Sequence, residues 1–407
     1  MCPSYRATLD ERHSTRGRAN AIRMAVAGGK PSGRHPNWHD PATLATLDLC
    51  LGCKACRTEC PSSVDIAQLK AEYLAQHYRG KDASAEARLL AHYRLFARVG
   101  AGLPTVFNRL SAAAPVRRFL ARWGGIAPQR TLPRFSRSLF RLAAGQRRRF
   151  SGQCPAGERR IVFFGDCFTA YHDSDLGLAV IRVIEKLGYR LHLADAGCCG
   201  RVLISSGLLE QAVATIQPTL ARLAGLAADP RVEAILVSEP SCFSAMIDDW
   251  RKLRHIGPPQ TLDAVLEKLI CVEDFVQRNW SRHPHPPTMR GRDVAALFHG
   301  HCHQKALWGV GETTDLLTRL CGKGLVTPAT GCCGMAGAFG YRKEHYDVSM
   351  NIFAQSEFDA VRQADPQTLL LAGGISCRDQ IRHATGRQAI HPIQLLDQLW
   401  TSAAPAS

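Results

Sequence analysis

The sequence predicts a small α-helical domain followed by a duplicated α/β domain. Three observations predict it: a tight cysteine run lies among helical patterns near the N-terminus, short apolar runs alternate with helical patterns from residue 161 onward, and the cysteines of that later region recur at matching spacings. The 407 residues, 45% of them hydrophobic, are enough for two or three domains that each bury a core. A disordered or fibrous protein is therefore excluded.

Residues 1–80 are expected to form the helical domain. Apolar side chains after the cysteine run recur at the spacing of one helix face, at Val64, Ile66, Leu69 and Tyr73. Residues 81–160 are rich in Arg and Pro, and we expect them to form a basic, helical linker to the α/β region.

The α/β region is expected to hold two units, at residues 161–285 and 286–407. In each unit, apolar runs typical of buried strands flank an amphipathic helix. The predicted strands are 161–165, 189–194 and 234–238, then 294–299 and 368–372, and the predicted helices are 176–187 and 313–320. Because strands and helices alternate, the sheets should be parallel, with ligands bound beyond the carboxyl ends of the strands.

The cysteine spacings indicate that the second unit repeats the first. In the first unit 30 residues separate the first cysteine from a Cys-Cys pair and 42 separate that pair from the last cysteine, and in the second unit the numbers are 29 and 43. Each unit therefore gathers four thiols near strand ends. These are Cys167, Cys198, Cys199 and Cys242 in the first unit and Cys302, Cys332, Cys333 and Cys377 in the second.

The sixteen cysteines indicate metal ligation rather than disulfides. They fall in tight clusters of a long chain whose residues 1–30 lack the apolar core of a secretory signal, and no stretch approaches about 18 consecutive apolar residues. We expect a cytoplasmic protein, or one that lies peripherally on the inner face of the membrane. For the isolated Cys154, Cys271 and Cys321, the expectation is a buried thiol without metal.

The positive charge is concentrated in the N-terminal part of the chain. Residues 1–160 hold 28 Lys+Arg against 10 Asp+Glu, and residues 79–160 alone hold 18 against 3. This segment suits an anionic membrane surface, because it also carries an imperfect apolar face of Leu89, Leu90, Tyr93 and Phe96. A solvated basic linker is an open alternative. No nucleic acid is expected, since the segment lacks nucleic-acid-binding motifs.

The cysteine run near the N-terminus is typical of a 4Fe–4S cluster site. Cys50, Cys53, Cys56 and Cys60, followed by Pro61, form the C-x2-C-x2-C-x3-C-P pattern of bacterial ferredoxins, and we call them the ferredoxin-type run. Three such thiolates ligate one cluster, while the fourth belongs to another. A zinc site is the alternative, but it would need a second C-x2-C or histidines at fixed offsets.

The ferredoxin-type run supplies only three of the four ligands that its cluster needs. Only Cys2, followed by Pro3, resembles the last cysteine of a preceding run, so Cys2 is the predicted fourth ligand and Cys60 is left without a cluster. Either the chain is a fragment or late translation start of a longer protein, which we favour, or a partner supplies the missing cysteines.

Each Cys-Cys pair lies between two glycines, at residues 197–200 and 331–334. Glycine permits the backbone angles and the close approach that a bulky cofactor needs. With these motifs, the later region resembles the cysteine-rich CCG domain of heterodisulfide reductase B-type subunits, of anaerobic glycerol-3-phosphate dehydrogenase C-type subunits and of glycolate oxidase iron–sulfur subunits.

Over essentially its whole length, the chain is similar to the carboxyl-terminal part of FAD-linked D-2-hydroxyacid dehydrogenases of the D-2-hydroxyglutarate and D-lactate type. The segments that carry this resemblance are residues 2–8, 13–19, 50–61, 299–305, 332–337 and 376–378. The resemblance implies an oxidoreductase acting on CH–OH donors whose FAD domain lies outside this chain, so no catalytic residue is expected here. Electrons would pass from that flavin through the clusters to a quinone or another acceptor.

The α/β units depart from the fullest CCG pattern, which ends in C-x-x-C. Glu239 and Gly374 occupy the first of those positions, so each unit offers four thiolates for a simpler cluster, for no cluster, or for thiol redox chemistry. This departure argues against a heterodisulfide reductase B-like subunit. That function stays an alternative, as do a glycerol-3-phosphate or glycolate dehydrogenase iron–sulfur subunit and a non-enzymatic metal-binding redox protein.

Three histidines, His299, His301 and His303, surround Cys302. They could ligate metal or move protons, but we expect them to be neighbours of the ligands, because softer thiolates are already present.

Overall fold

The N-terminal part of the computed structural model is a small cluster of helices. The structure describes residues 2–28, 35–81, 83–147, 159–288 and 293–402. Side-chain caps begin three of these helices, because Ser14, Asp40 and Asp65 each accept a hydrogen bond from the backbone N–H three residues later. The helices are α1 Pro3–Thr8, α2 Thr15–Val26, α3 Pro41–Asp48, α4 Ala55–Glu59 and α5 Ile66–Tyr78, with a 3-10 turn at Glu11–His13.

Helix α5 carries only part of the apolar face that the sequence predicts, because the helix begins at Ile66 and Val64 precedes it. Ile66 and Tyr73 are buried, and Tyr73 packs in a small core with Ala25 and Leu47. Leu69 is 38% exposed. The face is therefore narrower than its spacing suggests.

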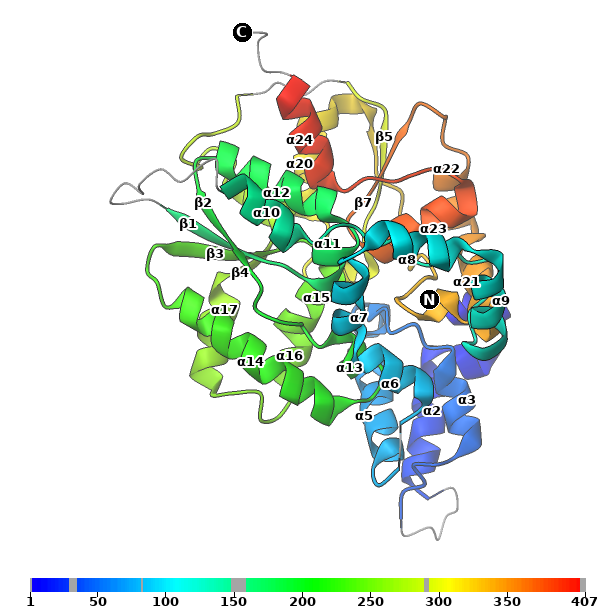
Figure 1. Cartoon of the computed structure of the whole chain (residues 1–407). Coiled ribbons are helices and arrows are strands. Elements are labelled where there is room, and N and C mark those ends of the chain that lie inside the picture. Colours follow the sequence, from blue (N-terminus) through cyan, green and yellow to red (C-terminus); the bar gives the residue numbers. More distant parts are fainter. Residues whose placement is uncertain (1, 29–34, 82, 148–158, 289–292, 403–407) are drawn as a thin grey trace.

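The basic segment, residues 81–160, forms short helices that lie against the α/β region (Figure 1). Arg130, which follows the fourth of these helices, is 3% exposed and donates to Gly340 O, Gln380 Oε1 and Ser349 Oγ at 2.8–2.9 Å. These bonds tie the segment to the second α/β unit. The helices are α6 Ala85–Ala91, α7 Tyr93–Gly100, α8 Pro104–Ala112, α9 Ala114–Trp123 and α10 Leu139–Arg147.

Two parallel sheets form the centres of the α/β region. Their strand orders are β2-β1-β3-β4 and β6-β5-β7. Five strands match the predicted ones, whereas the sequence does not predict β4 and β6, because runs of three and two residues carry no periodicity. The strands are β1 Arg160–Phe164, β2 Arg190–Ala194, β3 Val232–Val237, β4 Leu269–Cys271, β5 Ala296–His299, β6 Leu325–Val326 and β7 Leu369–Ala372.

The helices around the sheets include both predicted ones, as α12 and α20. Those of the first unit are α11 Cys167–Tyr171, α12 Ser174–Lys186, α13 Arg201–Ser205, α14 Leu209–Ala227, α15 Pro240–Ser244, α16 Trp250–Lys252, α17 Pro259–Lys268 and α18 Val272–Arg278, with a π-helical turn at Ala245–Asp249. Those of the second unit are α19 Cys302–Leu307, α20 Gly311–Cys321, α21 Tyr346–Phe353, α22 Asp359–Arg362, α23 Ile375–Thr385 and α24 Pro392–Ser402, with 3-10 turns at Gly322–Gly324, Phe339–Tyr341, Lys343–His345 and Ser356–Phe358.

One hydrophobic core joins the two sheets. Alternate residues of β1 point to opposite faces, so that Ile161 and Phe163 pack into this core while Phe164 packs into a second core on the other face. The shared core also contains Phe298 of β5 and Leu316 of α20. The two units therefore form one rigid body that can hold thiols from both halves at fixed positions.

No helix in the described part of the chain is both long enough and apolar enough to span a membrane.

Replacing Arg130 with Ala is expected to destabilise the protein by about 2–4 kcal/mol, because the buried oxygens that it satisfies lose their donor. The midpoint of denaturant-induced unfolding measures this loss. Arg137→Ala, at an exposed position of the same segment, is the matched control and should leave the midpoint nearly unchanged. Equal midpoints for the two variants would contradict the anchoring role of Arg130.

Candidate metal centres

The ferredoxin-type run folds back on itself at two residues with positive φ. Gly52 and Lys54 have φ of 65° and 62°, the left-handed region that glycine adopts without strain. Burial, and then the neighbouring Cys53 and Cys50 thiols, raise the pKa of Cys56 to about 12. The structure thus brings these three predicted ligands together.

Cys2 faces the same buried cation as the ferredoxin-type run. Arg18 is 1% exposed and its Nη1 donates to Cys2 Sγ at 3.0 Å. The pKa of Cys53 is lowered, first by the neighbouring Cys332 thiol and, among smaller causes, by the Arg18 charge. Arg18 thus contacts Cys2 and also favours the charged form of Cys53.

Cys60 has different surroundings from the other thiols of the run. It is partly exposed at the end of α4, and hydrogen bonds from the backbone N–H groups of Val64 and Ser62 lower its pKa. Among the described residues, the interactions that shift this pKa come from the backbone and not from other thiols. That Cys60 does not join the cluster of Cys50 stays a prediction.

The four thiols of the first α/β unit form one contact chain beyond the ends of three strands. Cys167 follows β1, the Cys-Cys pair follows β2 and Cys242 follows β3. Cys167 Sγ and Cys198 Sγ are 3.8 Å apart, and Cys199 hydrogen-bonds both Cys198 and Cys242. The predicted group is therefore assembled in space.

Glycine is required beside the pair in the first unit. Gly197 has a φ of 134°, and a Cβ placed there would lie 2.2 Å from Thr219 Oγ1. The hydroxyl of Thr219 in turn holds the loop through Cys198 N and O, both at 3.2 Å. Any larger residue at this glycine would displace the loop that presents the thiols.

A cavity of about 460 Å³ opens beside the thiols of the first unit. Its basic wall comes partly from the basic segment, whose Arg94 donates to Cys167 Sγ at 3.4 Å and pairs with Asp195. Leu90 and Tyr93, which the sequence assigned to one outward apolar face, line this cavity instead. The arginines around it are Arg94, Arg98, Arg201 and Arg222.

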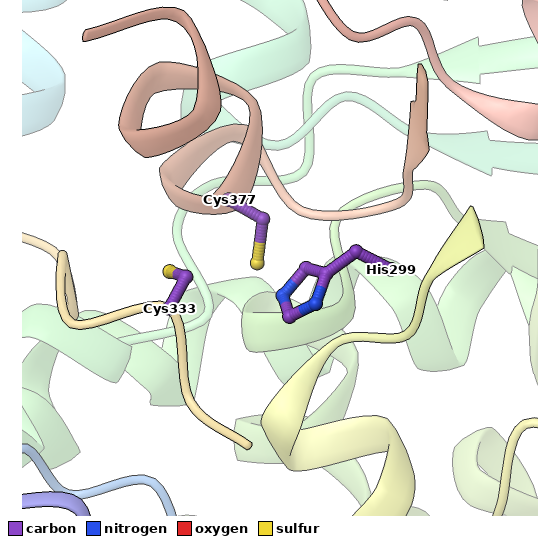
Figure 2. A group of neighbouring side chains, drawn as sticks. All are labelled: His299, Cys333 and Cys377. Atoms are coloured by element: carbon purple, nitrogen blue, oxygen red, sulfur yellow. The ribbon is translucent and has the colours of Figure 1, made fainter. Parts of the chain in front are cut away.

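The four thiols of the second unit are also assembled in one group. The Cys332 thiol lies beside the Cys302 and Cys333 thiols, and the Cys333 thiol lies beside Cys377 and His299, since each of these neighbours shifts the pKa of the thiol it faces. Figure 2 shows His299, Cys333 and Cys377 converging from β5, the Cys-Cys loop and α23. Their ligand atoms all lie within 4.8 Å of one another.

The ferredoxin-type run touches the second unit directly, which the sequence did not predict. Cys53 packs in the same small cluster as Cys332, and the two thiols line one cavity. His303 bridges the same junction, because its Nε2 donates to Gly52 O at 3.0 Å while its Nδ1 lies 2.6 Å from Ser244 Oγ of the first unit. With both nitrogens engaged, His303 is a connector and not a metal ligand.

A buried ion-pair cluster anchors the ferredoxin-type run to the first unit. Lys54 is 4% exposed, and its Nζ lies 2.7 Å from Asp248 Oδ2 and 2.6 Å from Asp249 Oδ1. Arg57 also pairs with Asp248. No sequence signal links these residues, which are more than 190 positions apart.

His301 and the two positions that depart from the CCG pattern have structural partners. His301 Nδ1 accepts from His303 N at 3.2 Å and caps α19. A Cβ at Gly374 would lie 2.4 Å from His301 Cδ2, so this imidazole fills the space of a side chain there. Glu239 accepts from Ile375 N at 3.0 Å and joins α15 to the start of α23.

The donor sets fit metal–sulfur centres. All cysteines of the three groups are free, and burial is among the causes that raise the pKa values of Cys167, Cys199 and Cys377 well above the ordinary range. Buried neutral thiols gain little stabilisation from lying side by side. A bound metal would stabilise them as thiolates, which are its ligands. Cys271 and Cys321 are buried, as the sequence predicts, and Cys154 lies outside the described residues.

Replacing Lys54 with Met keeps the apolar stem but leaves the buried Asp248 and the partly buried Asp249 short of a cation. We expect a loss of about 3–5 kcal/mol in unfolding free energy and faster loss of bound iron. Arg278→Met, which breaks an exposed pair with Glu312, should cost about 1 kcal/mol or less. A Lys54 variant as stable as the Arg278 variant would contradict the anchoring role.

Comparison with known proteins is consistent with this arrangement. Residues 1–65 match the family model of the 4Fe–4S dicluster domain, and residues 161–247 match that of the cysteine-rich domain CCG. No solved structure matches the chain.

Three relatives illustrate the similarity. The chain is 26% identical to D-2-hydroxyglutarate dehydrogenase of Pseudomonas putida over 98% of its own length and 41% of the relative's. It is 26% identical to the C-type subunit of anaerobic glycerol-3-phosphate dehydrogenase of Escherichia coli, over 76% of each chain. It is 24% identical to the glycolate oxidase iron–sulfur subunit of Escherichia coli, over 98% of this chain and 90% of the relative.

The chain thus spans about two fifths of the length of the D-2-hydroxyglutarate dehydrogenases that it matches. The resemblance inferred from the cysteine motifs is confirmed by these matches. Residues 1–65 thus resemble a 4Fe–4S dicluster domain, residues 161–247 resemble a cysteine-rich CCG domain, and the chain as a whole is similar to these oxidoreductases.

Proposed function

We propose that this chain is the iron–sulfur electron-transfer part of an FAD-linked D-2-hydroxyacid dehydrogenase of the D-2-hydroxyglutarate or D-lactate type. The observation that carries the proposal is the junction of two thiol groups, where Cys53 and Cys332 line one small cavity. Substrate oxidation would belong to an FAD-binding oxidase domain or subunit that this chain does not contain. A reading frame for such an oxidase beside that of this chain would support the pairing.

The first centre of the proposal is a 4Fe–4S cluster held by Cys2, Cys50, Cys53 and Cys56, with Cys60 left free. When bound, such clusters store and pass single electrons. The chain's own contribution is electrostatic, because Arg18 donates to Cys2 Sγ and Lys70 donates to Cys50 O at 2.9 Å. These two cations offset the negative charge of a thiolate-ligated cluster in a buried place.

The other two centres would lie at the four thiols of each α/β unit, which we propose to be copies of one another. The matching central strand orders, β2-β1-β3 and β6-β5-β7, support a duplication, as do thiols at corresponding strand ends. The proposed limits are residues 1–80 for the helical domain, 81–160 for the basic segment, and 161–285 and 286–407 for the two units.

The order of the thiol groups supports a path on which electrons leave the protein at the first unit. Cys53 meets the second unit, and a small cavity there shares Phe168, Arg201 and Val202 with the larger cavity of the first unit. That larger cavity is basic and partly aromatic. It is the site that we propose for a quinone or another acceptor.

We also propose that the basic segment contacts an anionic membrane surface. Helices α7 to α9 expose large apolar side chains, including Val99 at 54%, Leu103 at 63% and Trp123 at 74%. Arginines of the same helices accompany them, and the combination of apolar and basic side chains is typical of an interfacial helix. The protein would then lie peripherally on the inner face of the membrane.

The alternatives differ in what they require of the α/β units. A heterodisulfide reductase B-like subunit would use the position of Glu239 or Gly374 for a fifth thiolate, whereas Glu239 here joins two helices. A glycerol-3-phosphate or glycolate dehydrogenase iron–sulfur subunit would hold the same clusters but accept electrons from a flavoprotein that oxidises another substrate. A non-enzymatic metal-binding redox protein would need no flavoprotein partner.

Anaerobically purified protein is expected to contain at least about four irons and matching sulfide per chain, and to give an electron paramagnetic resonance (EPR) signal after dithionite reduction. Cys2→Ala and Cys53→Ser should remove the signal of the ferredoxin-type run. Cys321→Ser, at a buried cysteine outside the three groups, should preserve it. Zinc without sulfide would overturn the proposal.

The membrane contact is tested with vesicles of phosphatidylglycerol and phosphatidylcholine. Replacing both Leu95 and Val99 with Asp should weaken co-sedimentation about tenfold or more, because two apolar anchors are lost and two like charges are added. Val326→Asp, at an exposed apolar residue of β6, is the control. Binding that is unchanged in the double variant, or equal on neutral vesicles, would contradict the contact.

A further inference from the structure

One buried imidazole beside the thiols of the second unit has a nitrogen without a partner. His299 is 1% exposed, and its Nε2 has no hydrogen-bond partner among the described residues. A buried polar nitrogen of this kind costs free energy unless something binds it. A histidine kept in this state at the end of β5 therefore indicates a ligand for that atom.

The other ring nitrogen is held in a way that prepares the imidazole for metal. His299 Nδ1 lies 2.6 Å from Thr330 Oγ1, and Lys305 Nζ donates to the same hydroxyl oxygen at 3.0 Å. The hydroxyl oxygen has two lone pairs, so it can accept from the ammonium and from an Nδ1 proton at once. In that tautomer the Nε2 lone pair is free, as in metal-bound histidines whose other nitrogen is hydrogen-bonded.

The thiols that this nitrogen would join are already in place. The ligand atoms of His299, Cys333 and Cys377 lie within 4.8 Å of one another, and Figure 2 shows the ring turned toward both sulfurs. We propose that His299 Nε2 is a ligand of the iron–sulfur centre in the second unit, together with Cys333 and Cys377. This inference rests on the proposed function, since it assumes a cluster there.

The first unit provides an internal contrast. The residue three positions before its first cysteine is Phe164, which is fully buried and offers no donor atom, whereas His299 stands three positions before Cys302. The two centres would therefore differ in ligand chemistry although their cysteine spacings match. An imidazole is neutral where a thiolate is negative, so it raises the reduction potential of the centre that it ligates.

The inference is tested on the full chain, purified without oxygen and labelled with nitrogen-15 histidine. Pulsed EPR of the reduced protein should show a strongly coupled histidine nitrogen. His299→Ala should lose this coupling, while His301→Ala, which removes a histidine from the cavity that Cys333 and Cys377 line, should keep it. The signal of the ferredoxin-type run reports whether each variant is folded.

A second variant separates ligation from mere proximity. His299→Cys should keep the iron of the second unit but lose the nitrogen coupling and lower the midpoint potential of that centre, because a thiolate replaces the imidazole. Iron–sulfur protein without any coupled histidine, or with coupling that persists in His299→Ala, would overturn this inference alone. Protein without iron and sulfide would overturn the proposed function as well.

Discussion

The structure depends most on the docking of the ferredoxin-type run between the two α/β units. Lys54 enters a buried site between two carboxylates of the first unit, while Cys53 meets a thiol of the second. A buried ammonium tolerates little displacement, because its desolvation is offset only while both carboxylates stay in contact. This ion-pair cluster therefore sets where the first group of thiols sits relative to the other two.

The rest of the fold gives that docking a rigid base. The sheets of the two units share one hydrophobic core, and α12 packs against α24 across their boundary. Because close-packed cores resist displacement strongly, the thiols of both units keep fixed positions. Electron transfer between separate centres requires a fixed distance between them. The apolar core would maintain the distances between the thiol groups.

The sequence predicts those parts of the molecule that depend on local pattern. The buried strand β1 is recognisable because Ile161 to Phe164 form an unbroken apolar run, and the ligand groups are recognisable because thiols cluster at fixed spacings. The ferredoxin-type run and the CCG pairs are identified on that basis, and family models match residues 1–65 and the first unit at residues 161–247.

The contacts between distant segments could not be predicted in this way. Lys54 and Asp248 are 194 positions apart, and no periodicity connects them. Tyr93 looked like part of an outward apolar face but lines the cavity of the first unit, because helix α7 packs on α11 and not on water. The free nitrogen of His299 is likewise visible only when Thr330, from another loop, occupies the opposite side of the ring.

The central claim is that the three thiol groups form one row of centres with the second unit beside the ferredoxin-type run. The most direct measurement is the EPR spectrum of the fully reduced, anaerobically prepared chain, compared with that of a Cys332→Ser, Cys333→Ser variant. Adjacent centres predict a spectrum split or broadened by magnetic interaction, and the variant should reduce it to the simple signal of an isolated cluster. A wild-type spectrum that is already the sum of non-interacting signals would contradict the row.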